Sequence, residues 1–218
     1  MRRAGRLAAA AALLLAAGGA GFIALKGSAP APLPVLPGAA EPRAAGGHDL
    51  PFGPVRPARA LPEATLRLDD GSERRLSELT TGGFTVVQLM FAGCTTTCPL
   101  QGAIFREAQA LAAKEGVEAR LLSVSVDALG DDPAKLAAWL RDAGATPGWR
   151  AGVPALPELG PLLDALQGRG KDYDVHDARA YLVDPDGRLV FVSEDLPSPA
   201  ALVSLLREAA AARGGAPS

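Results

Sequence analysis

The sequence predicts an α/β domain, because strand-like and helix-like segments alternate through most of the chain and are followed by an antiparallel hairpin. Residues 84–91 are a nearly continuous apolar run, typical of a strand that is buried on both faces. Apolar residues then recur at helical spacing: Leu100, Ile104, Ala108 and Leu111. Residues 117–126 alternate as a second strand. This strand–helix–strand pattern is the first half of the predicted sheet.

Helix starts and turns define the elements that follow. Asp132 and Pro133 form an N-cap and a first helical residue, and a further helix fits residues 158–167. Residues 180–183 and 189–192 flank an Asp-Pro-Asp-Gly turn and predict an antiparallel hairpin.

Two outer elements complete the prediction. An Asp-Gly turn between residues 65–68 and 73–76 predicts an N-terminal hairpin. Ser198 and Pro199 open a closing helix. The order of elements is that of a three-layer α/β sandwich of the thioredoxin type.

The chain divides into four parts by composition. Residues 1–26 are expected to form a transmembrane anchor or a signal, and residues 27–60 a tether rich in Pro, Ala and Gly that cannot bury enough apolar surface to fold. Residues 61–213 are the predicted thioredoxin-like domain, and residues 214–218 a disordered tail.

The N-terminal segment predicts where the domain lies. The uncharged stretch 7–25 is just long enough to cross a hydrocarbon core of ~30 Å. Prolines among the small residues that follow disfavour a cleavage site, so we expect an uncleaved anchor. Arg2, Arg3 and Arg6 precede the stretch and only Lys26 follows it, which predicts that the domain is extracytoplasmic, on the periplasmic side.

The overall composition excludes one class of partner and limits the possible chemistry. The net charge is −2, with Lys and Arg spread along the chain, so no nucleic-acid partner is expected. Two cysteines and two histidines are the only soft or switchable ligands available. Any metal or redox site must therefore be built from very few residues.

The chemical centre predicted from the sequence is the pair Cys94 and Cys98. The pair follows the most buried strand and precedes a helix, the place where α/β sheets form ligand sites. A helix N-terminus also favours the thiolate over the thiol.

The spacing leaves three interpretations of the pair. Three residues separate the cysteines, one more than in a thioredoxin-type redox pair. Residues four apart on a helix have Cβ atoms ~5–6 Å apart, whereas a disulfide needs ~3.5–4.5 Å. A soft metal ion spans this gap readily, so the spacing favours a metal site. A redox pair and a plain stabilising disulfide remain open.

His176 is the candidate third ligand. It lies shortly before the predicted strand 180–183, whose start faces the cysteine loop in a thioredoxin-like layout. No proline stands between His176 and Tyr181, where related reductases carry one, which also favours a metal. Two thiolates and one imidazole suit Cu(I), Cu(II) with thiolate character or, less specifically, Zn²⁺. His48 lies in the predicted tether and is given no role, and Asp127 is expected to serve a turn or a cap.

Four stretches carry a resemblance to the Sco/SenC family: residues 91–99, 123–127, 175–176 and 181–188. The chain is similar to this family over about residues 61–206 and in its tethered N-terminus. The resemblance implies a thioredoxin-like fold that binds Cu(I) or Cu(II) through Cys94, Cys98 and His176. It also implies a metallochaperone that delivers copper to the dinuclear copper centre of cytochrome c oxidase, with the copper-bearing subunit or a similar membrane acceptor as its partner. The alternative is a thiol–disulfide oxidoreductase that reduces the cysteines of a partner's metal site.

Overall fold

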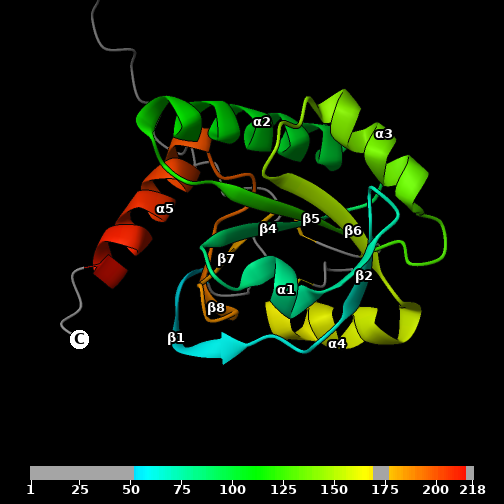
Figure 1. Ribbon diagram of the computed structural model, residues 1–218, viewed down its shortest axis with the longest axis horizontal. Coiled ribbons are helices and arrows are strands. Elements are labelled where there is room, and N and C mark those ends of the chain that lie inside the picture. The colour runs from blue at the N-terminus through cyan, green and yellow to red at the C-terminus, as the bar shows by residue number, and fades with distance from the viewer. Residues whose placement is uncertain (1–51, 169–176, 215–218) are drawn as a thin grey trace, which may run out of the picture. The chain divides into compact units, whose positions relative to one another are not determined.

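The computed structural model describes residues 52–168 and 177–214, which build one mixed eight-stranded sheet with helices on both faces (Figure 1). Across the sheet the strand order is β1-β8-β7-β4-β5-β6-β2-β3. The strands are β1 Gly53–Ala60, β2 Thr65–Leu68, β3 Glu73–Arg75, β4 Thr85–Met90, β5 Arg120–Ser125, β6 Trp149–Pro154, β7 Ala180–Val183 and β8 Arg188–Val192. The helices are α1 Leu76–Thr80, α2 Thr97–Glu115, α3 Pro133–Ala143, α4 Leu156–Leu166 and α5 Pro199–Gly214.

The centre of the sheet is parallel, as expected from the alternation of strands and helices. Strands β4, β5 and β6 run parallel, with Met90 opposite Ser125 and Val124 opposite Gly152. Every residue of β4 is buried, which explains its continuous apolar run. The carboxyl ends of these three strands therefore lie at one edge, and the cysteine loop leaves from the end of β4.

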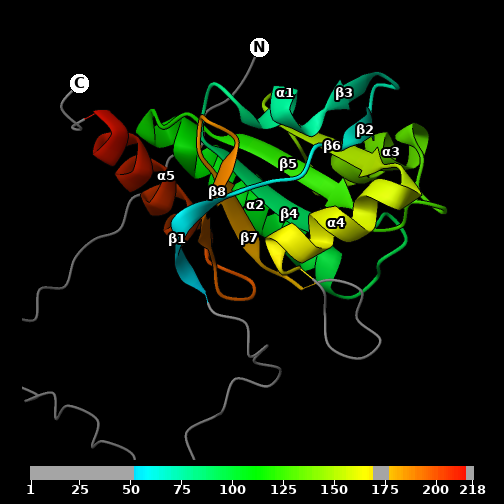
Figure 2. The same ribbon diagram turned by 90° about the horizontal axis from the view of Figure 1, so that it is seen from below.

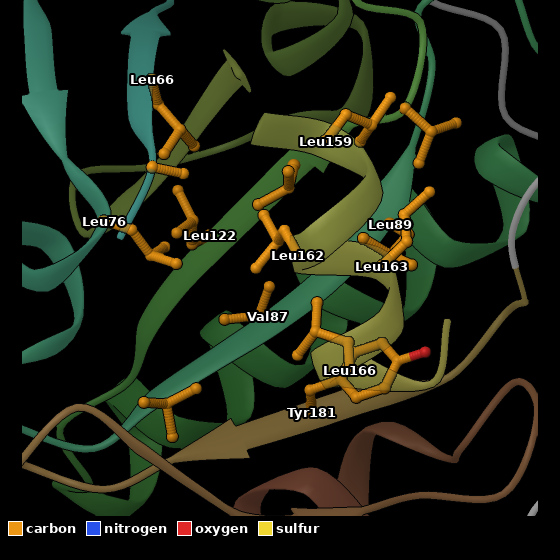
Figure 3. Close-up of a cluster of buried hydrophobic side chains, with 14 of the residues drawn as sticks. Leu66, Leu76, Val87, Leu89, Leu122, Leu159, Leu162, Leu163, Leu166 and Tyr181 are labelled. Carbon is orange, nitrogen blue, oxygen red and sulfur yellow. The ribbon is translucent and has the colours of Figure 1, made fainter. Parts of the chain in front are cut away.

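The helices divide between the two faces of the sheet, so the predicted three layers are present. Helices α2 and α3 cover one face and α4 covers the other (Figure 1). On the α4 face, leucines of the helix point into a core that reaches Leu66, Leu122 and Tyr181 on three different strands (Figure 3). On the opposite face, α2, α3 and α5 contribute side chains to a second core, which includes Cys98 and Phe105.

The predicted capping and turn signals are confirmed. The side chain of Asp132 accepts a hydrogen bond from the Lys135 amide at 2.9 Å and begins α3. Asp184 accepts from the amide of Arg188 at 2.9 Å in the turn between β7 and β8, and Gly187 there has φ +76°. Both hairpins predicted from the sequence form.

Strand β1 lies within residues 27–60, where the sequence analysis expected a tether. It pairs antiparallel with β8 at the outer edge of the sheet (Figure 2). The strand contains Pro54 and Pro57, and its register shifts between Pro54 and Arg59. Proline is tolerated at an edge because one side of the strand needs no ladder hydrogen bonds. The prolines, which made this segment look like a tether in the sequence, are therefore compatible with a strand at the edge of the sheet.

Strand β6 is a second element that the sequence analysis missed, because Gly148, Gly152 and Pro154 resemble loop residues. The structure gives Gly152 a packing role. A Cβ atom at Gly152 would lie 2.8 Å from Leu68 Cδ2 and 2.9 Å from Leu66 Cδ2. The missing side chain is therefore what lets β2 pack its leucines against this strand.

The predicted anchor of residues 1–26 and most of the predicted tether lie outside the described residues, as do residues 215–218 of the predicted tail. Among the residues that the structure does describe, no helix is both long enough and apolar enough to cross a membrane.

Candidate metal centre

The cysteine loop connects the buried end of β4 to the first turn of α2. The amide of Val126 donates to the carbonyl of Met90 at 2.8 Å and extends the contact between β4 and β5 past the last ladder pair. The amide of Cys94 then donates to the carbonyl of Phe91 at 3.1 Å, which closes a tight turn. The chain thus leaves the sheet in a fixed direction, and Cys94 lies just before the helix.

The two predicted sulfur residues lie together. Both cysteines are free thiols, and the amide of Cys98 donates to Cys94 Sγ at 3.3 Å. The sulfur of Cys94 therefore takes the place of a side-chain cap at the start of α2, where Thr96 makes no capping hydrogen bond of its own. The Thr96 hydroxyl lies 3.8 Å from the same sulfur.

The surroundings give the two thiols opposite acidities. Burial raises the pKa of Cys94, but hydrogen bonds from the Cys98 thiol and from the amides of Cys98 and Thr96 outweigh it, so the pKa falls below its usual value. Cys98 is fully buried; burial, followed by the neighbouring Cys94 sulfur, raises its pKa to about 12. Cys94 is thus the more acidic thiol of the pair, and Cys98 is the donor to it.

Asp131 braces the cysteine loop from the loop that follows β5, a role that the sequence analysis missed. Its Oδ2 accepts from the amide of Ala92 at 2.9 Å and from the hydroxyl of Ser125 at 2.6 Å. Only 5% of Asp131 is exposed, so these bonds are shielded from water. The available signal was a carboxylate shortly after a buried strand, at the edge where parallel strands end.

Asp127 has the turn role predicted for it. Its Oδ1 accepts from the amide of Gly130 at 2.7 Å, and its backbone carbonyl accepts from Asp131 at 2.9 Å. An open cavity of about 400 Å³ lies between this turn and the loop residues Ala92 and Gly93. Solvent therefore reaches the cysteine loop from the α3 side.

His176 lies outside the described residues. The described residues on either side of its segment lie at the end of the sheet that carries the cysteine loop. The amide of Asp177 donates to the carbonyl of Gly168 at 3.2 Å, which brings the two ends of the segment together. Ala180 lies opposite Gln88, two residues before the end of β4. Of the three predicted ligands, the structure therefore brings together Cys94 and Cys98. His48, which was given no role, is also outside the described residues.

Asp177 is held firmly beside this segment. It accepts a hydrogen bond from the Tyr181 hydroxyl at 2.5 Å, and Arg179 Nε lies 3.6 Å from its Oδ2. Burial raises the pKa of Asp177 despite these partners. Within the described part of the chain, no three His, Cys, Asp or Glu side chains gather as a metal site.

The comparisons with known proteins point to one family. The SCO1/SenC family model matches residues 63–147. No curated relative matches the sequence of the chain.

Several solved structures share the fold. A SCO1/SenC family lipoprotein from Bacillus anthracis has a TM-score of 0.62 at 21% identity, over 72% of this chain and 99% of its own. Yeast Sco1 with copper bound has a TM-score of 0.60 at 21% identity, over 70% and 89%. BsSco, a member of the Sco family of cytochrome c oxidase assembly proteins, has a TM-score of 0.63 at 21% identity, over 71% and 95%.

These structures show that the single mixed sheet is a thioredoxin-like fold of the Sco type. The part matched by the family model contains the cysteine pair, the brace Asp131 and strands β2 to β5. The resemblance predicted from the sequence is confirmed: the SCO1/SenC family model matches residues 63–147, and solved Sco proteins share the fold.

Proposed function

We propose that this chain binds copper through Cys94, Cys98 and His176 and delivers it to the dinuclear copper centre of cytochrome c oxidase. The observation that carries the proposal is the pair of free thiols at the start of α2, with the Cys98 amide 3.3 Å from Cys94 Sγ. Soft thiolate ligands suit Cu(I), as they do zinc and iron–sulfur clusters, and disfavour hard cations.

The pair is arranged to take up a cation. Cys94 is already the better thiolate, and it is the more exposed of the two sulfurs. Cys98 lies behind it and releases its proton when a metal replaces the hydrogen bond between the two side chains. The incoming ion therefore meets an exposed thiolate first and a buried ligand second.

His176 is the proposed third ligand because its segment begins and ends at the cysteine end of the sheet. Gly168 and Asp177 bracket the segment and are hydrogen bonded to each other. The paired position of Ala180 and Gln88 directs the chain before β7 toward the loop that follows β4. An imidazole there would complete a set of three soft ligands.

The solved relatives support copper as the cargo. Yeast Sco1 and ScoI from Bradyrhizobium japonicum are described with copper bound, and BsSco as a member of a family of cytochrome c oxidase assembly proteins. The Bacillus anthracis relative is described as a lipoprotein. This fits the proposal that residues 1–26 anchor the domain on the extracytoplasmic side of a membrane.

A thiol–disulfide oxidoreductase is the second candidate, favoured by the unequal thiols. The Cys94 thiolate would attack a partner's disulfide and form a mixed disulfide, which Cys98 would then resolve after losing its proton. The partner gains two thiols and this chain is left with a Cys94–Cys98 disulfide. The BsSco structure is described with a disulfide switch.

The test loads the reduced full chain with Cu(I) and measures transfer to the copper-bearing domain of the oxidase subunit from the same organism. Copper delivery predicts one Cu(I) per chain and transfer that is lost in Cys94→Ser. A chain that takes up no copper but reduces a disulfide in the metal-free acceptor domain, and does so equally well as His176→Ala, would replace delivery with the oxidoreductase.

A further inference from the structure

The large hydrophobic side chains that are exposed in the described residues all lie at one end of the sheet. They are Phe52, Leu100, Leu129, Leu156 and Leu196. We name this set the apolar end surface. We propose that it is the docking surface for a partner protein that has an apolar patch with a basic rim and presents copper ligands to Cys94.

The strand directions place the first three members at the cysteine end. Leu100 is in the first turn of α2, directly after Cys98 and Pro99. Leu129 follows β5, which is parallel to β4, so it lies in the neighbouring loop. Leu156 begins α4 after β6, which is parallel to β5.

The antiparallel strands place the other two members at the same end. Strand β7 runs against β4 and β8 runs against β7, so the residues after Val192, including Leu196, return to the cysteine end. Strand β1 runs against β8 with Gly53 opposite Val192, so Phe52 lies there too.

The exposure of these side chains is substantial. Leu129 is 82% exposed, Phe52 61% and Leu100 56%. Single exposed leucines are ordinary on a protein surface, but here all five large exposed side chains of the described residues share one end of the sheet, which is the reason for choosing this end as the docking surface.

The charges at this end favour a basic partner protein over a membrane or a second copy. Acidic residues in its described loops are Glu63, Asp127, Asp132, Glu194 and Asp195, whereas the exposed bases at this end include Lys135 and Arg75, of which Arg75 is paired with Glu78. Anionic lipid attracts basic rather than acidic surfaces. In a symmetric dimer the acidic rims would face each other.

The inference rests on the proposed copper delivery, but docking is measured without copper. The probe is the metal-free, copper-bearing domain of the oxidase subunit, titrated with the reduced, metal-free full chain in detergent. We expect Leu129→Ser and Leu156→Ser each to weaken binding by about tenfold, the effect of a well-buried anchor. Neither side chain is a proposed ligand, so Cu(I) uptake should be unchanged in both.

Charge is tested with a matched pair of reversals. Glu194→Arg at the cysteine end should weaken binding and reduce its dependence on salt. Glu118→Arg, exposed before β5 at the opposite end of the sheet, should leave both unchanged. Equal effects of the two reversals would overturn the assignment of the basic rim.

Other results would overturn the docking surface. One is that the wild-type chain does not bind the acceptor domain. Another is that neither leucine substitution weakens binding. If the leucine substitutions leave acceptor binding unchanged but weaken dimerisation of the chain, the surface belongs to a second copy. If they instead weaken binding to anionic vesicles, it belongs to lipid. A chain that binds the acceptor normally but takes up no copper would sink copper delivery and leave the docking surface standing.

Discussion

The amide of Cys98 donates a hydrogen bond to the sulfur of Cys94 across 3.3 Å, so the first turn of α2 is capped by a thiol group. The same contact brings the buried Cys98 side chain behind the more exposed Cys94. The carboxylate of Asp131 fixes the loop that delivers Cys94 by accepting from Ala92. The reactivity of Cys94 therefore depends both on its contact with Cys98 and on the position of the loop, and the two effects can be measured separately.

The two cysteines should react at very different rates with iodoacetamide. Hydrogen bonds lower the pKa of Cys94 against the effect of burial, whereas burial raises that of Cys98 to about 12. Between pH 7 and 8 we expect Cys94 to be alkylated more than about tenfold faster, since each pKa unit changes the thiolate population tenfold. Peptide mass spectrometry of the reduced, metal-free chain measures both rates.

The pH profile tests the cause of this difference. Because the pKa of Cys94 is lowered, its reactivity should persist to lower pH than that of an ordinary cysteine. Cys98→Ala removes the thiol donor but keeps the amide, so the Cys94 profile should move to higher pH. A profile that stays in place would show that the Cys98 thiol does not stabilise the thiolate.

Replacing Asp131 should loosen the loop as well as destabilise the domain. Asp131→Ala leaves the buried Ser125 hydroxyl and the Ala92 amide without their acceptor, which should cost about 2–5 kcal/mol of unfolding free energy. We also expect a changed rate of Cys94 alkylation. Asp132→Ala is the matched control: loss of the α3 cap should cost about 1 kcal/mol and leave Cys94 unaffected. Equal alkylation in both variants would contradict the brace.

Ser123 should be important for stability on the α2 face of the sheet. Its hydroxyl oxygen accepts from Gln88 Nε2 at 2.8 Å and from Trp149 Nε1 at 2.9 Å, both in the buried interior. Ser123→Ala leaves two buried donors without this acceptor and should lower the unfolding free energy by about 2–4 kcal/mol in denaturant titrations. Ser204→Ala, which removes only an exposed bond from Arg207, should change it by less than about 0.5 kcal/mol.

A side chain at position 152 should separate β6 from β2. A Cβ atom there would lie within 3.0 Å of atoms of Leu66 and Leu68, so Gly152→Ala should cost about 1–3 kcal/mol through overpacking. Gly214 has nothing within 4 Å of the same added atom, so Gly214→Ala should leave stability nearly unchanged. Thermal unfolding of the two variants compares them directly, and similar melting temperatures would contradict the packing role.

Much of the fold could be predicted because its signals are local. The apolar run of β4, the cap at Asp132 and the turn at Asp184 each identify an element without reference to the rest of the chain. Strands β1 and β6 could not be predicted in this way. Their prolines and glycines are compatible with strands only because β1 is an edge and Gly152 faces the leucines of β2.

In the site, too, the features with a local sequence signal could be predicted and those that depend on distant contacts could not. The motif spacing identified Cys94 and Cys98, and the structure brings them together. Asp131 makes its contact with a residue 39 positions away, so its place after a buried strand marks it as a candidate but does not identify the loop that it braces. The opposite acidities of the two cysteines likewise depend on burial in the packed helix, which motif spacing does not contain. The role of His176 stays a prediction.

The most direct test of the account is Cu(I) competition between the reduced full chain and a small chelator. Wild type, His176→Ala and the matched control His48→Ala should be compared. The account predicts one tightly held Cu(I) per chain. The affinity for Cu(I) should fall by tenfold or more in His176→Ala, which corresponds to a loss of about 1.4 kcal/mol or more of binding free energy. It should not change in His48→Ala. An unchanged affinity in His176→Ala would contradict the three-ligand site and leave Cys94 and Cys98 as a pair whose chemistry is that of disulfides.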